Sequence, residues 1–285
     1  LIDVKRPLLT IPNLAIHMNR EVNRGVALNK QIDMIPLFGM GSGEGGEFLE
    51  FLAKELQITK SDILDFELYV YCAEEPVLLG AKEEFVSSPR LDNLTSTQAL
   101  VSAIIEAKRE DGINLIALFD HEEVGSKTQQ GAGSFLIQEL LNRIFFGLGV
   151  ETETQSRLKY DSILMSVDVA HAVHPNQAEK ADVTNQPVLN GGFCIKKACS
   201  QSYATDCETS GIVEQICQAK EIPYQKFVNR SDIPGGSTLG SIASSLFPVR
   251  TVDIGIPILA MHSARELMGK DDMNALYQVV KGFME

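Results

Sequence analysis

Apolar positions along the chain follow two spacings, one typical of buried strands and one typical of helices with a single apolar face. Short apolar runs predict strands over residues 113–119, 162–169, 224–228 and 251–256. Apolar residues three or four positions apart predict helices over residues 94–109, 134–146, 207–220 and 272–283, and the start of another over 240–245. Strands that alternate with helices predict an α/β fold, with a mixed β-sheet sandwiched between helices.

The first part of the chain has a different pattern, which predicts a smaller, partly β domain over residues 1–62 and a main domain over residues 63–285. Its segments up to about residue 38 are extended and interrupted by prolines. A helix is predicted over 48–56, and a strand over 66–71 just beyond the boundary. The glycine-rich stretch 39–46 lacks the Lys-Ser/Thr ending of a phosphate loop, which disfavours a nucleotide site.

The run INLIALFDHEEVG, residues 113–125, joins a predicted buried strand to four ionisable residues in a row, Asp120 to Glu123. Carboxylates at the end of a buried strand are expected in the crevice at the carboxyl edge of the sheet, where α/β enzymes hold their ligands. Such carboxylates must be solvated, paired or bound to metal. A polar loop between a strand and a helix is the alternative interpretation.

Composition narrows the class of protein. The net charge of −13 and the pI near 4.9 argue against binding to nucleic acid or to an anionic membrane. The five cysteines are odd in number and show no C-x-x-C spacing, so they favour neither a disulfide framework nor a zinc ribbon, and a reducing cytoplasm is the simplest compartment. No apolar run approaches the ~18–20 residues of a membrane span.

Further acidic and imidazole side chains fall just past a predicted strand or just before a predicted helix, namely Asp92, Asp168 and His262. Taken singly, an aspartate before a helix is most often an N-cap, and a histidine is most often structural. Together with Glu122 and Glu123 they form a set of ligands suited to zinc, cobalt or manganese. Two metals in such a hydrolytic site would share a ligand and lie ~3.5–4 Å apart.

Six segments spread over nearly the whole chain stand out as a set. They are RPLLTIPNLAIH, SSPRLDNL, FDHEEVGS, DVAHAVHPN, GGSTLGSI and LAMHSARE. In this order they resemble the aspartyl aminopeptidases, which are dinuclear zinc exopeptidases of the α/β zinc-peptidase fold. The resemblance implies a metalloaminopeptidase that releases N-terminal Asp or Glu from peptides.

The resemblance also implies a role for each site residue. Asp92 would bridge both metal ions, and the peptide bond from Asp92 to Asn93 would be cis. Glu122 would be the general base that takes a proton from the attacking water. Glu123 would bind one metal, and Asp168 and His262 would each bind one of the two.

Other residues are implied to contact the substrate. One of His171 and His174 would stabilise the tetrahedral oxyanion, although simple support of the metal ligands is an equal alternative for this pair. Lys196 falls where the family carries a lysine that meets the acidic side chain of the substrate, with Lys197 as a competitor and Arg230 as an alternative cation.

Assembly is implied as well. His17 matches a histidine that reaches the active site of a neighbouring subunit, and the family forms closed tetrahedral dodecamers. The domain over residues 1–62 would then make the dimerisation and higher contacts of a homododecamer.

One departure from the family leaves alternatives open. The His-x-Asp-Ser-Pro segment that supplies the family's first metal ligand is absent from these residues. We expect that an N-terminal part precedes this chain in the natural protein. The competing hypotheses are a non-catalytic assembly or peptide-binding protein on a peptidase scaffold, and a dinuclear aminopeptidase or deacylase of other specificity.

Overall fold

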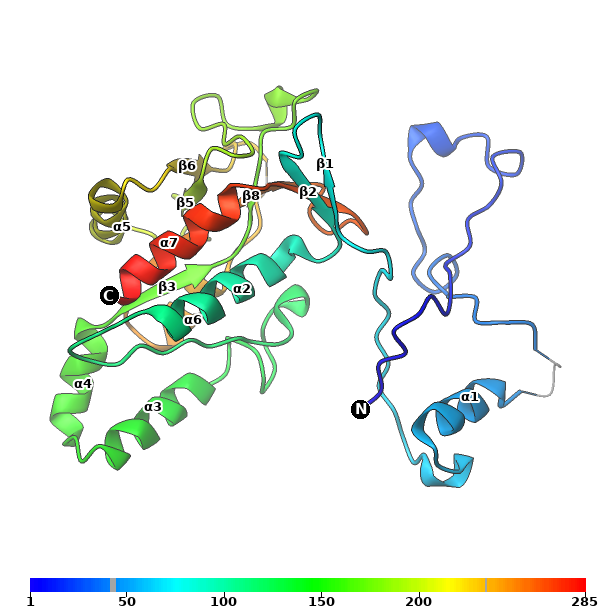
Figure 1. Ribbon diagram of the computed structural model, residues 1–285, viewed down its shortest axis with the longest axis horizontal. Coiled ribbons are helices and arrows are strands. Elements are labelled where there is room, and N and C mark those ends of the chain that lie inside the picture. The colour runs from blue at the N-terminus through cyan, green and yellow to red at the C-terminus, as the bar shows by residue number, and fades with distance from the viewer. Residues whose placement is uncertain (42–44, 234) are drawn as a thin grey trace. The chain divides into compact units, whose positions relative to one another are not determined.

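The computed structural model describes residues 1–41, 45–233 and 235–285, and its contacts divide the chain into two units, Leu1–Ala73 and Glu74–Glu285. Figure 1 shows the elements of both units. The division falls after the boundary predicted near residue 62. Part of the glycine-rich stretch 39–46 lies outside the described residues.

The described residues of the unit Leu1–Ala73 hold little regular structure. Their elements are the α-helix α1, Glu47–Leu56, the short 3-10 helices Val22–Arg24 and Lys60–Asp62, and a bridge between Thr10 and Leu37. The helix predicted over 48–56 is therefore confirmed. The strand predicted over 66–71 is wrong, because the structure assigns no strand there. Instead of joining a ladder, Phe66 packs against Phe48 of α1, with ring centroids 6.1 Å apart.

The unit Glu74–Glu285 contains two mixed sheets among its described residues. One has the strand order β3-β7-β5-β6 and the other β1-β2-β9-β8-β4. The first sheet consists of β3, Ile163–Val167; β7, Arg250–Gly255; β5, Phe193–Lys197; and β6, Tyr224–Val228. The second consists of β1, Val77–Leu79; β2, Phe85–Ser88; β9, Glu266–Gly269; β8, Pro257–Leu259; and β4, Ala170–His171.

Helices cover both faces of the sheet that contains β7, as the α/β prediction requires. The helices are α2, Leu91–Glu106; α3, Leu136–Gly147; α4, Thr152–Asp161; α5, Cys207–Lys220; α6, Leu239–Leu246; and α7, Asp272–Met284. Helices α2 and α7 run side by side (Figure 1), and with α5 they bury Val252 and Ile254 of β7. Asp253, which points to the opposite face, lies against Gly240 of α6. The expected fold class is thus confirmed.

The strand predicted over 113–119 is wrong. The structure assigns no strand to these residues, and Ile113, Leu115 and Leu118 are 48%, 46% and 53% exposed. An apolar run becomes a strand only when a neighbouring strand supplies hydrogen bonds, and no strand of the described residues pairs with this one. The other predicted strands and helices are confirmed to within a few residues.

The break between the two sheets positions part of the site. Strands β3 and β7 run parallel, and their pairing continues past the end of β3, where the Asp168 amide donates to the Ile254 carbonyl at 2.9 Å and the Ala170 amide to the Ile256 carbonyl at 2.8 Å. A Cβ atom at Gly255 would overlap the Asp168 carbonyl oxygen. A glycine is therefore required where the chain carries Asp168 out of the first sheet.

Candidate metal centre

Three segments far apart in the sequence bring Asp92, Glu123 and His262 together. One ligand atom from each lies within 4.8 Å of the other two. The Nε2 atom of His262 is 3.0 Å from Oδ2 of Asp92 and 3.3 Å from Oε2 of Glu123. The three residues come from the start of α2, from the 3-10 helix Glu122–Val124 and from the loop between β8 and β9. These are three of the four residues predicted from the sequence as ligands of a divalent metal, the fourth being Asp168.

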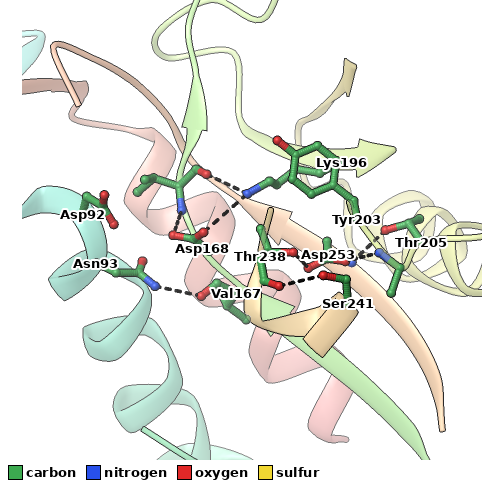
Figure 2. Close-up of polar contacts among 12 residues, drawn as sticks. Asp92, Asn93, Val167, Asp168, Lys196, Tyr203, Thr205, Thr238, Ser241 and Asp253 are labelled. Carbon is green, nitrogen blue, oxygen red and sulfur yellow. Dashed lines mark hydrogen bonds and ion pairs between the residues drawn. The ribbon is translucent and has the colours of Figure 1, made fainter. Parts of the chain in front are cut away.

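The start of α2 is shaped around Asp92. The Asp92–Asn93 peptide bond is cis, which confirms the bond expected there, and neither residue has helical backbone angles. The Asn93 side chain donates from Nδ2 to the Val167 carbonyl at 3.0 Å, which ties this turn to the end of β3 (Figure 2). The Asp92 side chain is only 9% exposed, while those of Glu123 and His262 are 58% and 61% exposed.

Glu266, at the start of β9, holds two of these residues by their backbones. One carboxylate oxygen accepts from the Asp92 amide at 2.9 Å, and the other accepts from the His262 amide at 2.8 Å. Its side chain is buried. Glu266 was not among the site residues predicted from the sequence, although it lies inside the segment LAMHSARE.

Asp168 lies close to this cluster but is not one of the three residues whose ligand atoms converge. Its Oδ1 accepts from the Val169 amide at 2.8 Å, and its Oδ2 is 3.7 Å from the Lys196 ammonium (Figure 2). Its charge reaches the cluster, because it is among the causes that raise the pKa of both Asp92 and Glu122. Its predicted role as a metal ligand stays a prediction.

The crowding of carboxylates shifts their titration. Burial, followed by the charges of Asp168 and Glu123, raises the pKa of Asp92 to about 7. Burial and the same two charges also raise the pKa of Glu122. A cation between these groups would relieve the repulsion and keep Asp92 ionised. The charge, type and spacing of the side chains therefore fit a divalent metal ion.

Lys196 is buried on β5, with its side chain 3% exposed. Its ammonium donates to the Val169 carbonyl at 2.8 Å and lies 4.8 Å from the centre of the Tyr203 ring (Figure 2). The residue predicted to meet an acidic substrate thus already has a carbonyl, a carboxylate and an aromatic face around its charge.

Three more of the predicted substrate residues meet in one place. His171, His174 and Arg230 line a cavity of about 220 Å³, together with Lys180, which was not predicted from the sequence. The Arg230 guanidinium is paired with both carboxylate oxygens of Asp232, at 2.6 and 2.9 Å. No salt bridge is recorded for Lys180 among the described residues. Lys180 had no signal in the sequence beyond its place shortly after His174.

His17 belongs to the unit Leu1–Ala73, where it lies exposed in a turn. Its predicted contact with a neighbouring subunit stays a prediction. Within the described ranges, no helix has the length and apolar character that crossing a membrane requires.

Comparison with known proteins gives consistent matches over almost the whole chain. A family model described as Peptidase M18, aminopeptidase I zinc metalloprotease, matches residues 1–284. The "Probable M18 family aminopeptidase 2" of Clostridium novyi (strain NT) is 44% identical, and the match covers 99% of this chain and 66% of that protein. The protein of the same description from Azotobacter vinelandii (strain DJ) is 41% identical, with 99% and 66% covered.

The fold matches solved structures equally well. A chain in the cryo-EM structure of the Ape4 and Nbr1 complex superposes with a TM-score of 0.90 at 35% identity, and the match covers 98% of this chain and 58% of that one. This chain therefore spans about two thirds or less of the length of the relatives that it matches.

Proposed function

The chain belongs to the M18 family of aminopeptidase I zinc metalloproteases, and on that premise we propose that the protein is a metalloaminopeptidase that releases N-terminal Asp or Glu from peptides. The observation that carries the proposal is the convergence of Asp92, Glu123 and His262, with Glu122 next to Glu123 in the chain. The proposal concerns the whole protein, because this chain spans 66% of the length of its curated relative.

Two divalent metal ions would bind at this cluster, zinc by the description of the family and cobalt or manganese by ligand type. Asp92 would be shared, Glu123 would bind one ion, and Asp168 and His262 would bind one each. Bound metal supplies Lewis acidity, which lowers the pKa of a water molecule and polarises a carbonyl oxygen.

Glu122 would serve as the general base. Its carboxyl group has a raised pKa because it is partly buried and faces the charges of Asp168 and Glu123. A general base works best when its pKa lies near the working pH, because it can then both accept a proton and give it up again. Glu122 would take a proton from the attacking water and deliver it to the departing amine.

The cavity of His171, His174 and Arg230 would hold the first residue of the substrate. An imidazole donor from one of the two histidines would stabilise the developing oxyanion. Lys196, Arg230 and Lys180 are the cations available for an acidic side chain. Lys196 is buried and donates a hydrogen bond to the Val169 carbonyl, and Arg230 is paired with Asp232. Lys180 is therefore the cation of the three that is most available to a substrate carboxylate.

Self-association through the unit Leu1–Ala73 is part of the proposal. The unit Leu1–Ala73 exposes many large apolar side chains, including Leu14, Ile16 and Ile32 at 65%, 56% and 70%. Contact between copies would cover them, and a homododecamer with His17 near the site of a neighbouring subunit is the proposed form. A cytoplasmic location completes this proposal.

The test uses the full-length protein, stripped with a chelator and reloaded with zinc, cobalt or manganese, on Asp- and Leu-peptides. Release of Asp should require metal. The variant Glu122→Gln should keep its metal content and lose activity by at least about 10²-fold, the lower end of what general-base catalysis contributes. Glu153→Gln, at an exposed position on α4, is the matched control and should stay active.

Absence of activity with every metal would reject the proposal in favour of an assembly or peptide-binding protein. Specificity is tested separately by the variants Lys196→Ala, Arg230→Ala and Lys180→Ala. The residue that meets the acidic side chain should lose kcat/KM on Asp-peptides far more than on Leu-peptides. Equal losses on both peptides would remove that role from the residue, and rapid cleavage of Leu-peptides by the unaltered protein would indicate another specificity.

A further inference from the structure

Glu266 is one of the buried acidic residues that the proposed mechanism does not use. We propose that it is a positioning residue, whose single carboxylate aligns Asp92 and His262 and so sets the affinity of the metal centre. The inference rests on the proposed function only in taking Asp92 and His262 as metal ligands.

The position of Glu266 in the second sheet explains how one side chain reaches both ligands. Glu266 begins β9 and lies opposite Ser88, the last residue of β2. The chain runs from Ser88 through a short turn to Asp92, and His262 lies four residues before Glu266 in the loop that leads into β9. The pairing of β2 with β9 therefore places both ligand backbones beside the same carboxylate.

The hydrogen bonds divide evenly between the two carboxylate oxygens. Oε2 accepts from the Asp92 amide at 2.9 Å and Oε1 accepts from the His262 amide at 2.8 Å. These distances are typical of charge-assisted bonds from an N–H to a carboxylate. Each oxygen accepts a hydrogen bond from the backbone of one proposed ligand. A displacement of the carboxylate would therefore move the backbones of Asp92 and His262 together.

Among the described residues, no cationic side chain forms an ion pair with the Glu266 carboxylate. Glu266 is 2% exposed. The neighbouring Arg265 faces elsewhere and donates to the carbonyls of Glu75 and Ser87, at 2.9 and 2.8 Å. A buried charge is stabilised here by the two ligand amides, so loss of the carboxylate leaves both amides without an acceptor.

The decisive variant is Glu266→Gln, which preserves shape but offers one acceptor oxygen in place of two. One of the two ligand amides then faces an amide NH₂ group. We expect the zinc affinity of the full-length protein to fall about 10- to 100-fold, as for the loss of groups that orient metal ligands. The absorption spectrum of the cobalt-loaded protein should shift, because the spectrum reports the geometry of the ligands.

A second variant tests whether the length of the side chain matters separately from its charge. Glu266→Asp keeps two acceptor oxygens and the charge but shortens the side chain by one methylene group. It should weaken zinc binding as well, with a cobalt spectrum that is also shifted. Both variants are measured in zinc-buffered solution by metal analysis after dialysis, so that the readout does not depend on catalysis.

Asp272 provides a matched control within the same unit. It is a fully buried carboxylate that also accepts from two backbone amides, those of Asn190 and Gly192, both at 2.8 Å. Neither amide belongs to a proposed ligand. Asp272→Asn should lower the melting temperature while leaving zinc affinity and the cobalt spectrum unchanged.

The outcomes are distinguishable. If Glu266→Gln and Glu266→Asp fold and bind zinc with unaltered affinity and an unaltered cobalt spectrum, Glu266 is only a structural brace and the inference is wrong. If the unaltered protein binds no zinc or cobalt, the proposed function itself fails. If Asp272→Asn weakens zinc binding as much as Glu266→Gln, the effect is a general loss of stability, which would also overturn the inference.

Discussion

Asp92 is the most enclosed of the four proposed ligands. Its side chain is 9% exposed, and its backbone is held on one side by Glu266 and on the other by the tie from Asn93 to Val167. Enclosure fixes the direction of the carboxylate, which benefits metal binding. It also penalises the charged form when no cation is present, and this is the first cause of the raised pKa of Asp92.

Metal affinity should therefore depend on pH in a defined direction. With a pKa of about 7, Asp92 carries a proton below neutrality in the metal-free protein, and a metal ion must displace it. Apparent zinc affinity should rise about 10-fold per pH unit, for this one proton, up to about pH 7 and depend less on pH above it. Titrations from pH 5.5 to 8.5 in a competing chelator would measure this.

The comparison variant is Asp92→Asn, which removes the titrating group. It should bind zinc weakly and lose the part of the pH dependence that belongs to this proton. A wild-type affinity that does not change between pH 5.5 and 7 would contradict the assignment of Asp92 as an enclosed ligand.

At the scale of elements, the path from β3 to β4 determines where Asp168 points. Strand β3 of the first sheet ends at Val167, and strand β4 of the second sheet begins at Ala170. Asp168 therefore lies in the short connection between the two sheets. Opposite this connection, β7 ends at Gly255, and the close approach of the two backbones leaves no room for a side chain. A single glycine thus permits the crossing that carries Asp168 beside Lys196.

Replacement of this glycine should damage both stability and the site. Gly255→Ala would force the two backbones apart, at a cost of about 1–3 kcal/mol or more, as for other overpacked interiors. We expect a lower melting temperature and reduced metal content, measured by calorimetry and by metal analysis.

Gly211→Ala is the matched control, because Gly211 lies within α5 and a Cβ atom there would meet no other atom. That change should be neutral or stabilising by up to about 1 kcal/mol, since alanine is the better helix former. A Gly255→Ala protein as stable as the Gly211→Ala protein would refute the close-approach argument.

At the scale of the whole molecule, the two units differ in how they are stabilised. The unit Glu74–Glu285 buries a continuous core that includes Phe193, Ile254 and Leu276. In the described part of the unit Leu1–Ala73, the buried apolar residues are Leu52 and Ala53 of α1. A segment with so little core of its own depends on contacts with other surfaces for its stability.

Self-association should therefore be sensitive to charge on the first unit. Ile16→Glu places a carboxylate on a side chain that is 56% exposed and next to His17. We expect a shift from a large assembly to smaller species in sedimentation velocity, because a charge is costly to bury in an apolar contact.

Lys30→Glu, at an exposed position of the same unit, controls for charge alone. It should leave the assembly unchanged. A protein that sediments as a monomer before any substitution would contradict the proposal of a homo-oligomer.

Local sequence was sufficient for elements whose stabilising contacts lie mainly within one segment. The helix predicted over 207–220 is α5 with the same bounds, because Asp206 caps it through the Thr209 amide and its apolar positions repeat on one face. The polar helix α4 has no apolar stripe and was not predicted. The short strands β1, β2, β4, β5, β8 and β9 were also missed.

The sequence by itself determined the α/β class, most helices and the residue types of the site, since these depend on periodicity and on local motifs. Only the tertiary structure decided that 113–119 stays unpaired, that Lys196 is enclosed beside Asp168, and that Glu266 holds Asp92 and His262 together. The physical reason is that strand pairing and enclosed hydrogen bonds join groups far apart in the sequence, such as Asp92 and Glu266, which are 174 residues apart, and no local pattern records which partners meet.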